Sequence, residues 1–373
     1  MIIDEDVRNV LAALSWFVGY TPPPDAAGVL QAHDLPVTAW AFPEDQPFPI
    51  GDGSSVGDLA AFGQSLRGRA EQTGLHLLVR GDQGWPAGTG CDVLPCLWVR
   101  GDPQVARLVQ RAVTLTGSSA PSEYGLFVAE QLTTGLAAAG WTAVTGVRLG
   151  ADYAVTSALR TAAVVRPVLV SGAGLDGDLP YVYERIADTA ARRGALISPF
   201  PPGCPPSDAR SAVVASLLGT LTAATVVVEA RRGDPVLACA AAAAASGRPV
   251  CAVPGHVGSM LSAGCHDLLA AGAAHLVTDA ALVLAALTAP SPGRPAGFDS
   301  GELYRVSGTA GWDDGWWHAK TVPPFYVAAD SHHNAADQAF QVLFTAPKPG
   351  ATLTAGVYGP DGTYQAVEVS TTT

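Results

Sequence analysis

The residues best suited to hold an anion form the loop TGSSAPSEYG at 116–125, which follows an apolar run. Its small residues would let backbone N–H groups face a phosphate, and a helix that begins near Ser122 would add its positive dipole end. The loop is not a G-x-G-x-x-G and has no P-loop lysine. The alternative is an ordinary turn in which Ser122 caps the helix. The candidate phosphate-binding residues are Gly117, Ser118, Ser119, Ser122, Tyr124 and Gly125.

A second loop, GVRLG at 146–150, opens another helical stretch. Arg148 is a candidate for phosphate contact, since a guanidinium is suited to bidentate binding of phosphate oxygens. Gly150 would shape the turn and Asp152 would cap the helix that follows. A surface arginine beside a plain cap explains the same residues, so both interpretations stay open.

A third group of charged residues follows the apolar run ATVVVEA at 224–230. Glu229 at the end of that run could orient a donor or a ribose hydroxyl, or pair with an arginine or a helix N-terminus. Arg231 and Arg232 come directly after it, and Arg210 lies in SDARSAVVASL at 207–217. These arginines, with Arg148, are the expected cations of a groove for a phosphate backbone.

No combination of side chains in the sequence indicates catalysis. There is no Ser-His-Asp arrangement, no G-x-S-x-G and no H-E-x-x-H. Cys91 and Cys96 form the only close cysteine pair and have no second pair to complete a zinc site. His256 and His266 are interpreted as structural. We therefore expect a protein that is not an enzyme and that holds no cofactor and no metal.

Short apolar runs alternate with alanine-rich helical stretches between residues 76 and 288. The runs are rich in β-branched residues and end in Gly, Ser or Pro, which favours strands. Helices are predicted at 56–72, 124–139, 181–193 and 236–246. The alternation predicts βαβ units with right-handed crossovers. The expected fold class is therefore α/β, a Rossmann-like doubly wound parallel sheet covered by helices on both faces.

Composition divides the chain into parts with different character. Residues 1–75 predict a small helical domain, and 76–288 predict the Rossmann-type domain. A proline-rich linker at 289–297 leads to residues 298–373, which contain clustered tryptophans and predict a small β-rich domain with strands at 341–346, 352–359 and 364–370.

Net charge argues against a uniformly basic nucleic-acid binder, because the chain carries −12. The acidity lies mainly at the two ends, however. Residues 101–288 hold 13 acidic and 12 basic groups, which leaves room for a local basic patch. The acidic start MIIDEDVRNV is not a secretory signal, and no apolar run is long enough to span a bilayer. We expect a cytoplasmic protein without membrane contact.

Taken in order, these segments resemble the DprA/Smf (DNA-processing protein A) family over residues 76–288. TGSSAPSEYG is similar to its G-[SA]-R-x-x-[ST]-x-Y-G loop, and ALISPFPPG to its S-E-x-P-P-G segment. SGRPVCAVPG and SAGCHDLLAAGAAHLVTD are similar to its closing stretch. The resemblance implies a dimeric protein that binds single-stranded DNA and assists a RecA-type recombinase during natural transformation and DNA recombination.

The chain departs from the family pattern at the anion-facing positions. Ser119 stands where the family has an arginine, Thr156 replaces a histidine, and Arg210 is the one arginine left of an R-N-R motif. The tail at 298–373 does not resemble a winged helix. Two alternatives therefore stay open beside DNA binding. One is a module for a nucleotide-derived small molecule, and the other is a scaffold that pairs with a related protein.

Overall fold

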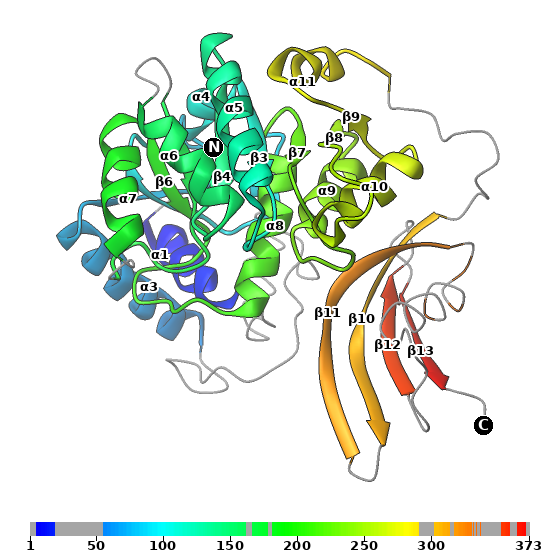
Figure 1. The fold of residues 1–373 in the computed structure, drawn as a ribbon. Helices are drawn as coiled ribbons and strands as arrows, with labels where there is room; N and C mark the ends of the chain where they lie inside the picture. The colour runs from blue at the N-terminus through cyan, green and yellow to red at the C-terminus, as the bar shows by residue number, and fades with distance from the viewer. Residues whose placement is uncertain are drawn as a thin grey trace.

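The structure, a computed structural model, describes residues 5–18, 55–161, 166–177 and 181–290. Beyond these it describes the strands 302–313, 317–329, 352–358 and 364–370, with Ser331, His333 and Ala336. A nine-stranded sheet forms the centre of the fold (Figure 1), in the spatial order β1-β2-β6-β5-β4-β3-β7-β8-β9. Its strands are β1 (Leu75–Leu78), β2 (Leu97–Gly101), β3 (Ala112–Thr116), β4 (Thr142–Gly146), β5 (Val168–Val170), β6 (Ala195–Ser198), β7 (Thr225–Val227), β8 (Val250–Ala252) and β9 (His275–Leu276).

All neighbouring pairs from β6 across to β9 are parallel, as the predicted βαβ units require. The helices that cover the sheet are α1 (Glu5–Leu14), α3 (Val56–Gln72), α4 (Val105–Val109), α5 (Glu123–Ala138), α6 (Ala151–Thr161), α7 (Tyr181–Arg193), α8 (Asp208–Leu221), α9 (Leu237–Ala245), α10 (Ala263–Ala270) and α11 (Ala280–Ala286). The predicted Rossmann-like α/β class is confirmed.

The strands are apolar on both sides because helices pack on both faces of the sheet. Leu169 of β5 packs in one core with α1, α3 and α7. Its neighbours Val168 and Val170 point the other way, into a core with α4 and α8. Likewise Val226 of β7 packs toward α5 and Val227 toward α9. Successive residues of each strand thus pack into cores on opposite faces of the sheet. Both sets of side chains are apolar for this reason, and each strand appears in the sequence as a continuous apolar run.

The helix predictions hold closely. The stretches 56–72 and 181–193 are α3 and α7, while α5 and α9 begin or end within one residue of their predicted bounds. A capping box begins α3, where the Ser55 hydroxyl accepts from the Asp58 N–H and the Asp58 carboxylate accepts from the Ser55 N–H. Helix α8, which begins in the segment noted at 207–217 and ends at Leu221, was not predicted as a helix.

The first two strands differ from the all-parallel expectation. β2 runs antiparallel to both β1 and β6, and it was not among the predicted strands. The N-terminal helix α1 packs against this edge of the sheet, where the buried Trp98 indole N–H donates to the Ser15 hydroxyl at 3.0 Å. The helical N-terminal part therefore shares a core with the sheet, and a domain boundary at residue 75 stays a prediction.

The tail forms a second sheet of four antiparallel strands in the order β11-β10-β12-β13. Its strands are β10 (Glu302–Asp313), β11 (Trp317–Ala329), β12 (Thr352–Tyr358) and β13 (Tyr364–Ser370). Two of these were predicted at 352–359 and 364–370, whereas β10 and β11 were not. The strand predicted at 341–346 lies outside the described residues. The expected linker and the extent of a β-rich domain at 298–373 remain predictions.

Candidate nucleic-acid interface

The strand order reverses between β3 and β7, because β4, β5 and β6 follow on one side of β3 and β7, β8 and β9 lie on the other. In open parallel sheets, ligands bind outside the carboxyl ends of the strands at such a point. The loops after β3 and β7 meet there, and the Ser118 N–H donates to the Glu229 carbonyl at 2.7 Å. A Cβ at Gly117 would crowd Ala151 and the Glu229 backbone. The predicted loops are therefore brought together at the switch point.

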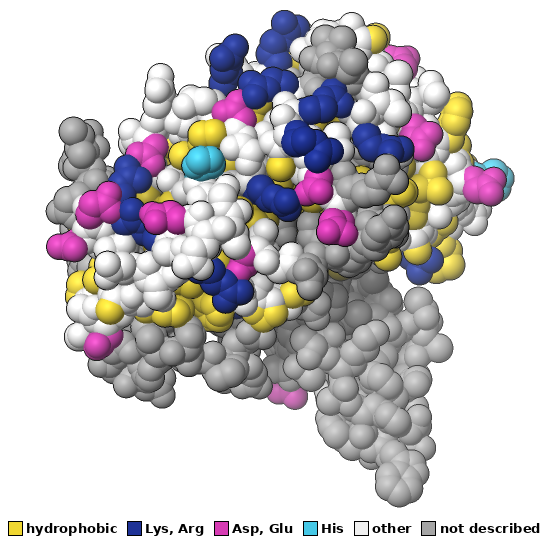
Figure 2. All heavy atoms as spheres, turned by 90° about the vertical axis from the view of Figure 1, so that its left-hand side faces the viewer, with side chains coloured by type: hydrophobic (Ala, Val, Ile, Leu, Met, Phe, Trp, Pro, Cys, Tyr) yellow, Lys and Arg dark blue, Asp and Glu magenta, His cyan; other side chains and the backbone are white. Residues whose placement is uncertain are grey.

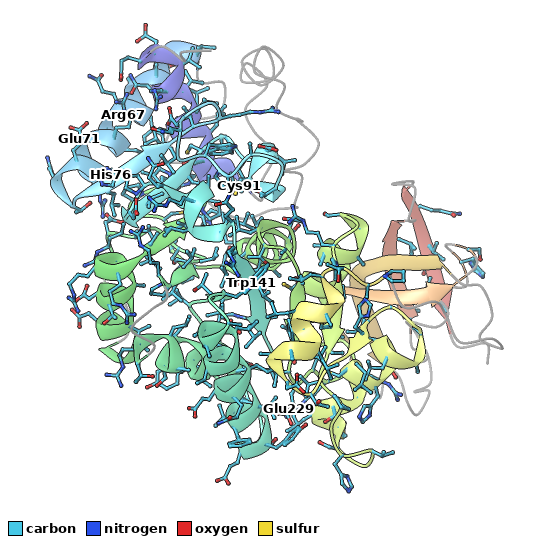
Figure 3. All side chains as sticks on the ribbon, turned by 90° about the horizontal axis from the view of Figure 1, so that it is seen from above. Arg67, Glu71, His76, Cys91, Trp141 and Glu229 are labelled. Atoms are coloured by element: carbon cyan, nitrogen blue, oxygen red, sulfur yellow. The ribbon has the colours of Figure 1, made fainter. Side chains whose placement is uncertain are left out.

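The Glu229 side chain, labelled in Figure 3, contacts Ser122 at the N-terminus of α5. Glu229 is 2% exposed, and its carboxylate accepts from the Ser122 N–H at 2.8 Å and from the Ser122 hydroxyl at 2.7 Å. Ser122 also caps α5 by accepting from the Gly125 N–H. A Cβ on Gly125 would fall inside contact distance of Glu229 Oε2, so only glycine fits there.

The capped turn, one of the two interpretations of this loop, is observed, and phosphate binding by the loop stays a prediction. The carboxylate lies at the positive end of the helix dipole and accepts from the Ser122 N–H and hydroxyl. Of the two interpretations of Glu229, the pairing with a helix N-terminus is the one observed. Ser119 is exposed at the surface of the loop, whereas Ser118 is buried.

Arg148 is held in place by two side chains from neighbouring elements. Its Nε donates to Asp152 Oδ2 at 2.8 Å, and its Nη2 donates to the Thr116 hydroxyl at 2.9 Å. Thr116 in turn donates to Asp152 Oδ1 at 2.9 Å. Gly150 permits the tight turn between them, with a φ of 86° that favours glycine. The charge of Asp152 raises the pKa of Arg148, so the guanidinium stays cationic.

A cavity of about 500 Å³ lies at the carboxyl ends of β3, β4 and β5, and Arg148 lines it with 34% of its side chain exposed. Arg69 of α3 reaches the same cavity and pairs with Asp176, whose carboxylate also accepts from the Gly203 N–H at 2.6 Å. Small residues form much of the remaining wall: Ser171, Gly172, Ala173, Gly174 and Cys204. The cavity combines two guanidinium groups with backbone that a ligand can approach closely.

Arg69 was not among the predicted site residues. It lies 79 positions before Arg148, on a helix that sequence patterns assign to a separate N-terminal domain. Only the packing of α3 against the sheet brings it to this cavity. No local signal in the sequence distinguishes it from Arg67, which instead contacts Asn9 and Glu5 of α1.

A second hollow of about 530 Å³ lies on the other side of the switch point, beside Tyr124 and Glu229. The Tyr124 hydroxyl donates to the Pro254 carbonyl at 2.7 Å, and its side chain is 46% exposed. Burial raises the pKa of this phenol, and the nearby Glu229 charge acts in the same direction. The His266 ring lies within hydrogen-bond distance of the Gly255 carbonyl, in the segment that follows β8. This contact agrees with a structural role for His266.

The remaining predicted arginines are divided between the interior and the surface. Arg210 is 0% exposed, lies 5.6 Å from the Phe200 ring centroid and donates to the Pro205 carbonyl. It is a core residue in this structure, which corrects its expected place on a phosphate groove. Arg232 makes a bidentate pair with Asp267 at 2.7 and 2.9 Å, and Arg231 is exposed beside it.

Metal-ligating residues do not gather anywhere in the described ranges, where no three His, Cys, Asp or Glu side chains lie close enough to share an ion. All six cysteines are buried free thiols. Among the helices of the described residues, none has the length and apolarity needed to cross a bilayer.

Residues 76–288 match the sequence family described as DNA recombination-mediator protein A. The DNA processing protein DprA of Mycobacterium tuberculosis is 34% identical over 220 residues, which cover 56% of this chain and 56% of that protein. Protein Smf of Escherichia coli is 32% identical over 213 residues, again 56% of each. The chain thus spans just over half the length of the curated relatives it matches.

Solved structures agree with these matches at the level of the fold. DprA from Streptococcus pneumoniae superposes with a TM-score of 0.59 at 21% identity, covering 76% of this chain and 98% of that one. DprA from Helicobacter pylori, whose structure is described as giving insight into a single-stranded DNA binding mode, superposes with a TM-score of 0.50 at 20% identity. It covers 57% of this chain and 95% of that chain.

Proposed function

The chain belongs to the DNA recombination-mediator protein A family, and on that premise we propose that it is a DNA-processing protein that binds single-stranded DNA without catalysing a reaction. The observation that carries the proposal is the pair of guanidinium groups, Arg148 and Arg69, in one cavity at the carboxyl ends of β3, β4 and β5. Relatives whose names describe DNA processing make a nucleic-acid backbone the ligand that best fits these cations.

The chemistry of the cavity suits an extended strand better than a compact anion. Arg148 is fixed by Asp152 and Thr116, so it offers its remaining N–H groups with little loss of conformational freedom. Gly172 and Gly174 lack side chains that would keep a sugar-phosphate backbone away. Both arginines are paired with carboxylates, so we expect modest affinity that falls with salt.

The nucleotide alternative is weaker on the geometry. Glu229 would have to accept a ribose hydroxyl in the hollow beside Tyr124. Its two oxygens already accept two hydrogen bonds from Ser122, and it is almost fully buried. We therefore favour DNA over a nucleotide-derived small molecule as the ligand.

The finer features of the proposal rest on the family alone. We infer that the protein acts in the cytoplasm as a homodimer, or paired with a related protein. We also infer that it assists a RecA-type recombinase in DNA uptake and recombination. A pull-down of the purified protein with a RecA-type recombinase on single-stranded DNA would test this role, and recombinase loading unchanged by the protein would contradict it.

The binding proposal is tested by fluorescence anisotropy with a labelled single-stranded oligonucleotide at two salt concentrations. Arg69→Gln removes one cavity cation. The double change Arg148→Gln/Asp152→Asn removes the other without leaving a buried carboxylate unpaired. We expect each to weaken binding several-fold and to lower the salt slope by about 0.7 per lost contact.

Arg67→Gln is the matched control, because Arg67 lies on the same helix but faces α1. It should leave the affinity unchanged. Equal binding by wild type and both cavity variants would place the DNA elsewhere and overturn the proposal. Loss of binding in the Arg67 variant as well would indicate a general charge effect.

A further inference from the structure

A group of arginines gathers at the amino ends of the parallel strands, on the opposite edge of the sheet from the cavity. Arg111 directly precedes β3, Arg166 lies two residues before β5, and Arg193 two residues before β6. Three more arginines lie in the last turns of the helices that precede these strands: Arg107 of α4, Arg160 of α6 and Arg192 of α7. We call these six the amino-edge arginines.

Hydrogen bonds show that most of these residues are neighbours in space. Arg166 Nε donates to the Arg193 carbonyl at 3.1 Å, and Arg193 Nη1 donates to the Arg160 carbonyl at 3.0 Å. The Arg111 carbonyl accepts from the Thr142 N–H, and the Thr142 hydroxyl contacts the Arg166 carbonyl. Figure 2 shows Lys and Arg side chains gathered in the upper half of the face over α6 and α7.

The local charge is opposite to that of the whole chain. The net charge is −12, yet two carboxylates, Asp102 and Asp188, lie among these arginines. Asp102 pairs with Arg166, and Asp188 pairs with the adjacent Arg100 of β2. Five of the six amino-edge arginines are exposed, and Arg193 is half-buried. A surplus of exposed guanidinium groups at one edge creates a positive field that attracts polyanions.

Helix capping explains only some of these side chains. Cations near the C-termini of α6 and α7 complement the helix dipoles, and Arg193 donates to carbonyls at the end of α6. Arg166 donates to the end of α7. The Arg111 guanidinium lies over the Trp141 ring, 5.5 Å from its centroid, and the residue is exposed. Arg107 and Arg192 are exposed.

We propose that the amino-edge arginines form a second nucleic-acid contact, which binds the phosphate backbone outside the cavity. Neighbouring strands are about 4.8 Å apart, so the edge from β6 to β3 spans about 14 Å, and a DNA strand passes several phosphates over that distance. The ligand is the phosphodiester backbone, because guanidinium forks bind phosphate oxygens without reading bases. This inference rests on the proposed DNA-binding function and extends it to a second surface.

The test compares a short strand of about 6 nucleotides with a long one of about 40. The variant Arg107→Gln/Arg192→Gln removes two exposed amino-edge cations. The control Arg67→Gln/Arg80→Gln removes the same charge away from that edge. We expect the edge variant to bind the long strand roughly tenfold more weakly, with a salt slope lowered by about 1.4, and to bind the short strand as wild type does. The control should match wild type on both strands.

The outcomes separate the two proposals. The cavity proposal would stand if only the cavity variant Arg148→Gln/Asp152→Asn lost short-strand binding. The amino-edge proposal would be overturned if the edge variant also bound the long strand as wild type does. Equal weakening in edge variant and control would also overturn it. If polyglutamate binding depends on the edge arginines while DNA binding does not, the edge fits an acidic protein, and the proposal fails. Thermal unfolding of each variant verifies that the fold is retained.

Discussion

Ser122 and Glu229, 107 positions apart in the sequence, are joined by two hydrogen bonds that close the N-terminus of α5. The serine supplies both its N–H and its hydroxyl, and the glutamate supplies one oxygen to each. In this loop, which resembles the anion-binding loop of the family, the Glu229 carboxylate lies where an external anion would otherwise bind. The neighbouring cavity, which Arg148 lines, is where we propose that an external phosphate backbone binds.

The first prediction concerns this closure. Glu229→Gln keeps the size of the side chain. It removes the negative charge that interacts with the N-terminus of α5 and with the Ser122 N–H and hydroxyl. We expect a loss of about 1–3 kcal/mol in the free energy of unfolding, because hydrogen bonds to charged groups contribute about that much. Urea unfolding measures it, and a variant as stable as wild type would show that the carboxylate adds nothing to the fold.

Gly125 gives a second prediction. Gly125→Ala would push its Cβ into Glu229 Oε2, and we expect it to destabilise the protein by about 1–3 kcal/mol. Gly68→Ala is the control, because no heavy atom lies within 4 Å of the added Cβ in that helix interior. It should stabilise by up to about 1 kcal/mol through helix propensity. Similar effects at both glycines would contradict the steric explanation.

The cysteines predict a loss of stability in alkali. Burial raises the pKa of Cys91, Cys96 and Cys239, among others, from 9.0 to about 12. A thiol with a raised folded pKa contributes its full stability below pH 9 and loses it as the pH rises from 9 toward 12. We expect unfolding free energy to fall above pH 9. Replacing Cys96 by Ser or Ala should lessen that slope, and a slope independent of the thiols would contradict the prediction.

The same burial predicts slow alkylation. Thiolates are the reactive form, and the folded protein holds the cysteines buried and protonated at pH 8. Iodoacetamide should therefore modify them only in urea, as mass spectrometry would show. Rapid modification of Cys204, which lines the cavity, in the native protein would indicate that the cavity opens.

Arg232 is expected to matter little for stability. Its pair with Asp267 is about half exposed on both sides, so Arg232→Ala should cost no more than about 1 kcal/mol. Its measurable effect would be on DNA. If Arg231 and Arg232 contact the backbone, Arg231→Ala/Arg232→Ala should lower the salt slope by about 1.4. An unchanged slope would remove both from the interface.

Local patterns in the sequence were sufficient for the central α/β elements. The β-branched runs that end in small residues became the parallel strands, and the helix at 56–72 was predicted to the residue. These features depend on residues close in sequence, because hydrophobic period, caps and turns act over a few positions. The antiparallel strand β2 was not predicted. Its direction is set by its pairing with β6 and β1 and not by its own composition.

Patterns local in the sequence were enough to predict six of the parallel strands, four of the helices around them and the loops that meet at the switch point. Which side chains those loops bring into contact depends on the tertiary fold. It placed Glu229 on Ser122, buried Arg210 beside Phe200, and brought Arg69 from the N-terminal helix to the cavity of Arg148. These outcomes depend on contacts between residues far apart in the chain, where burial and charge pairing in three dimensions choose among side chains that look equivalent in the sequence.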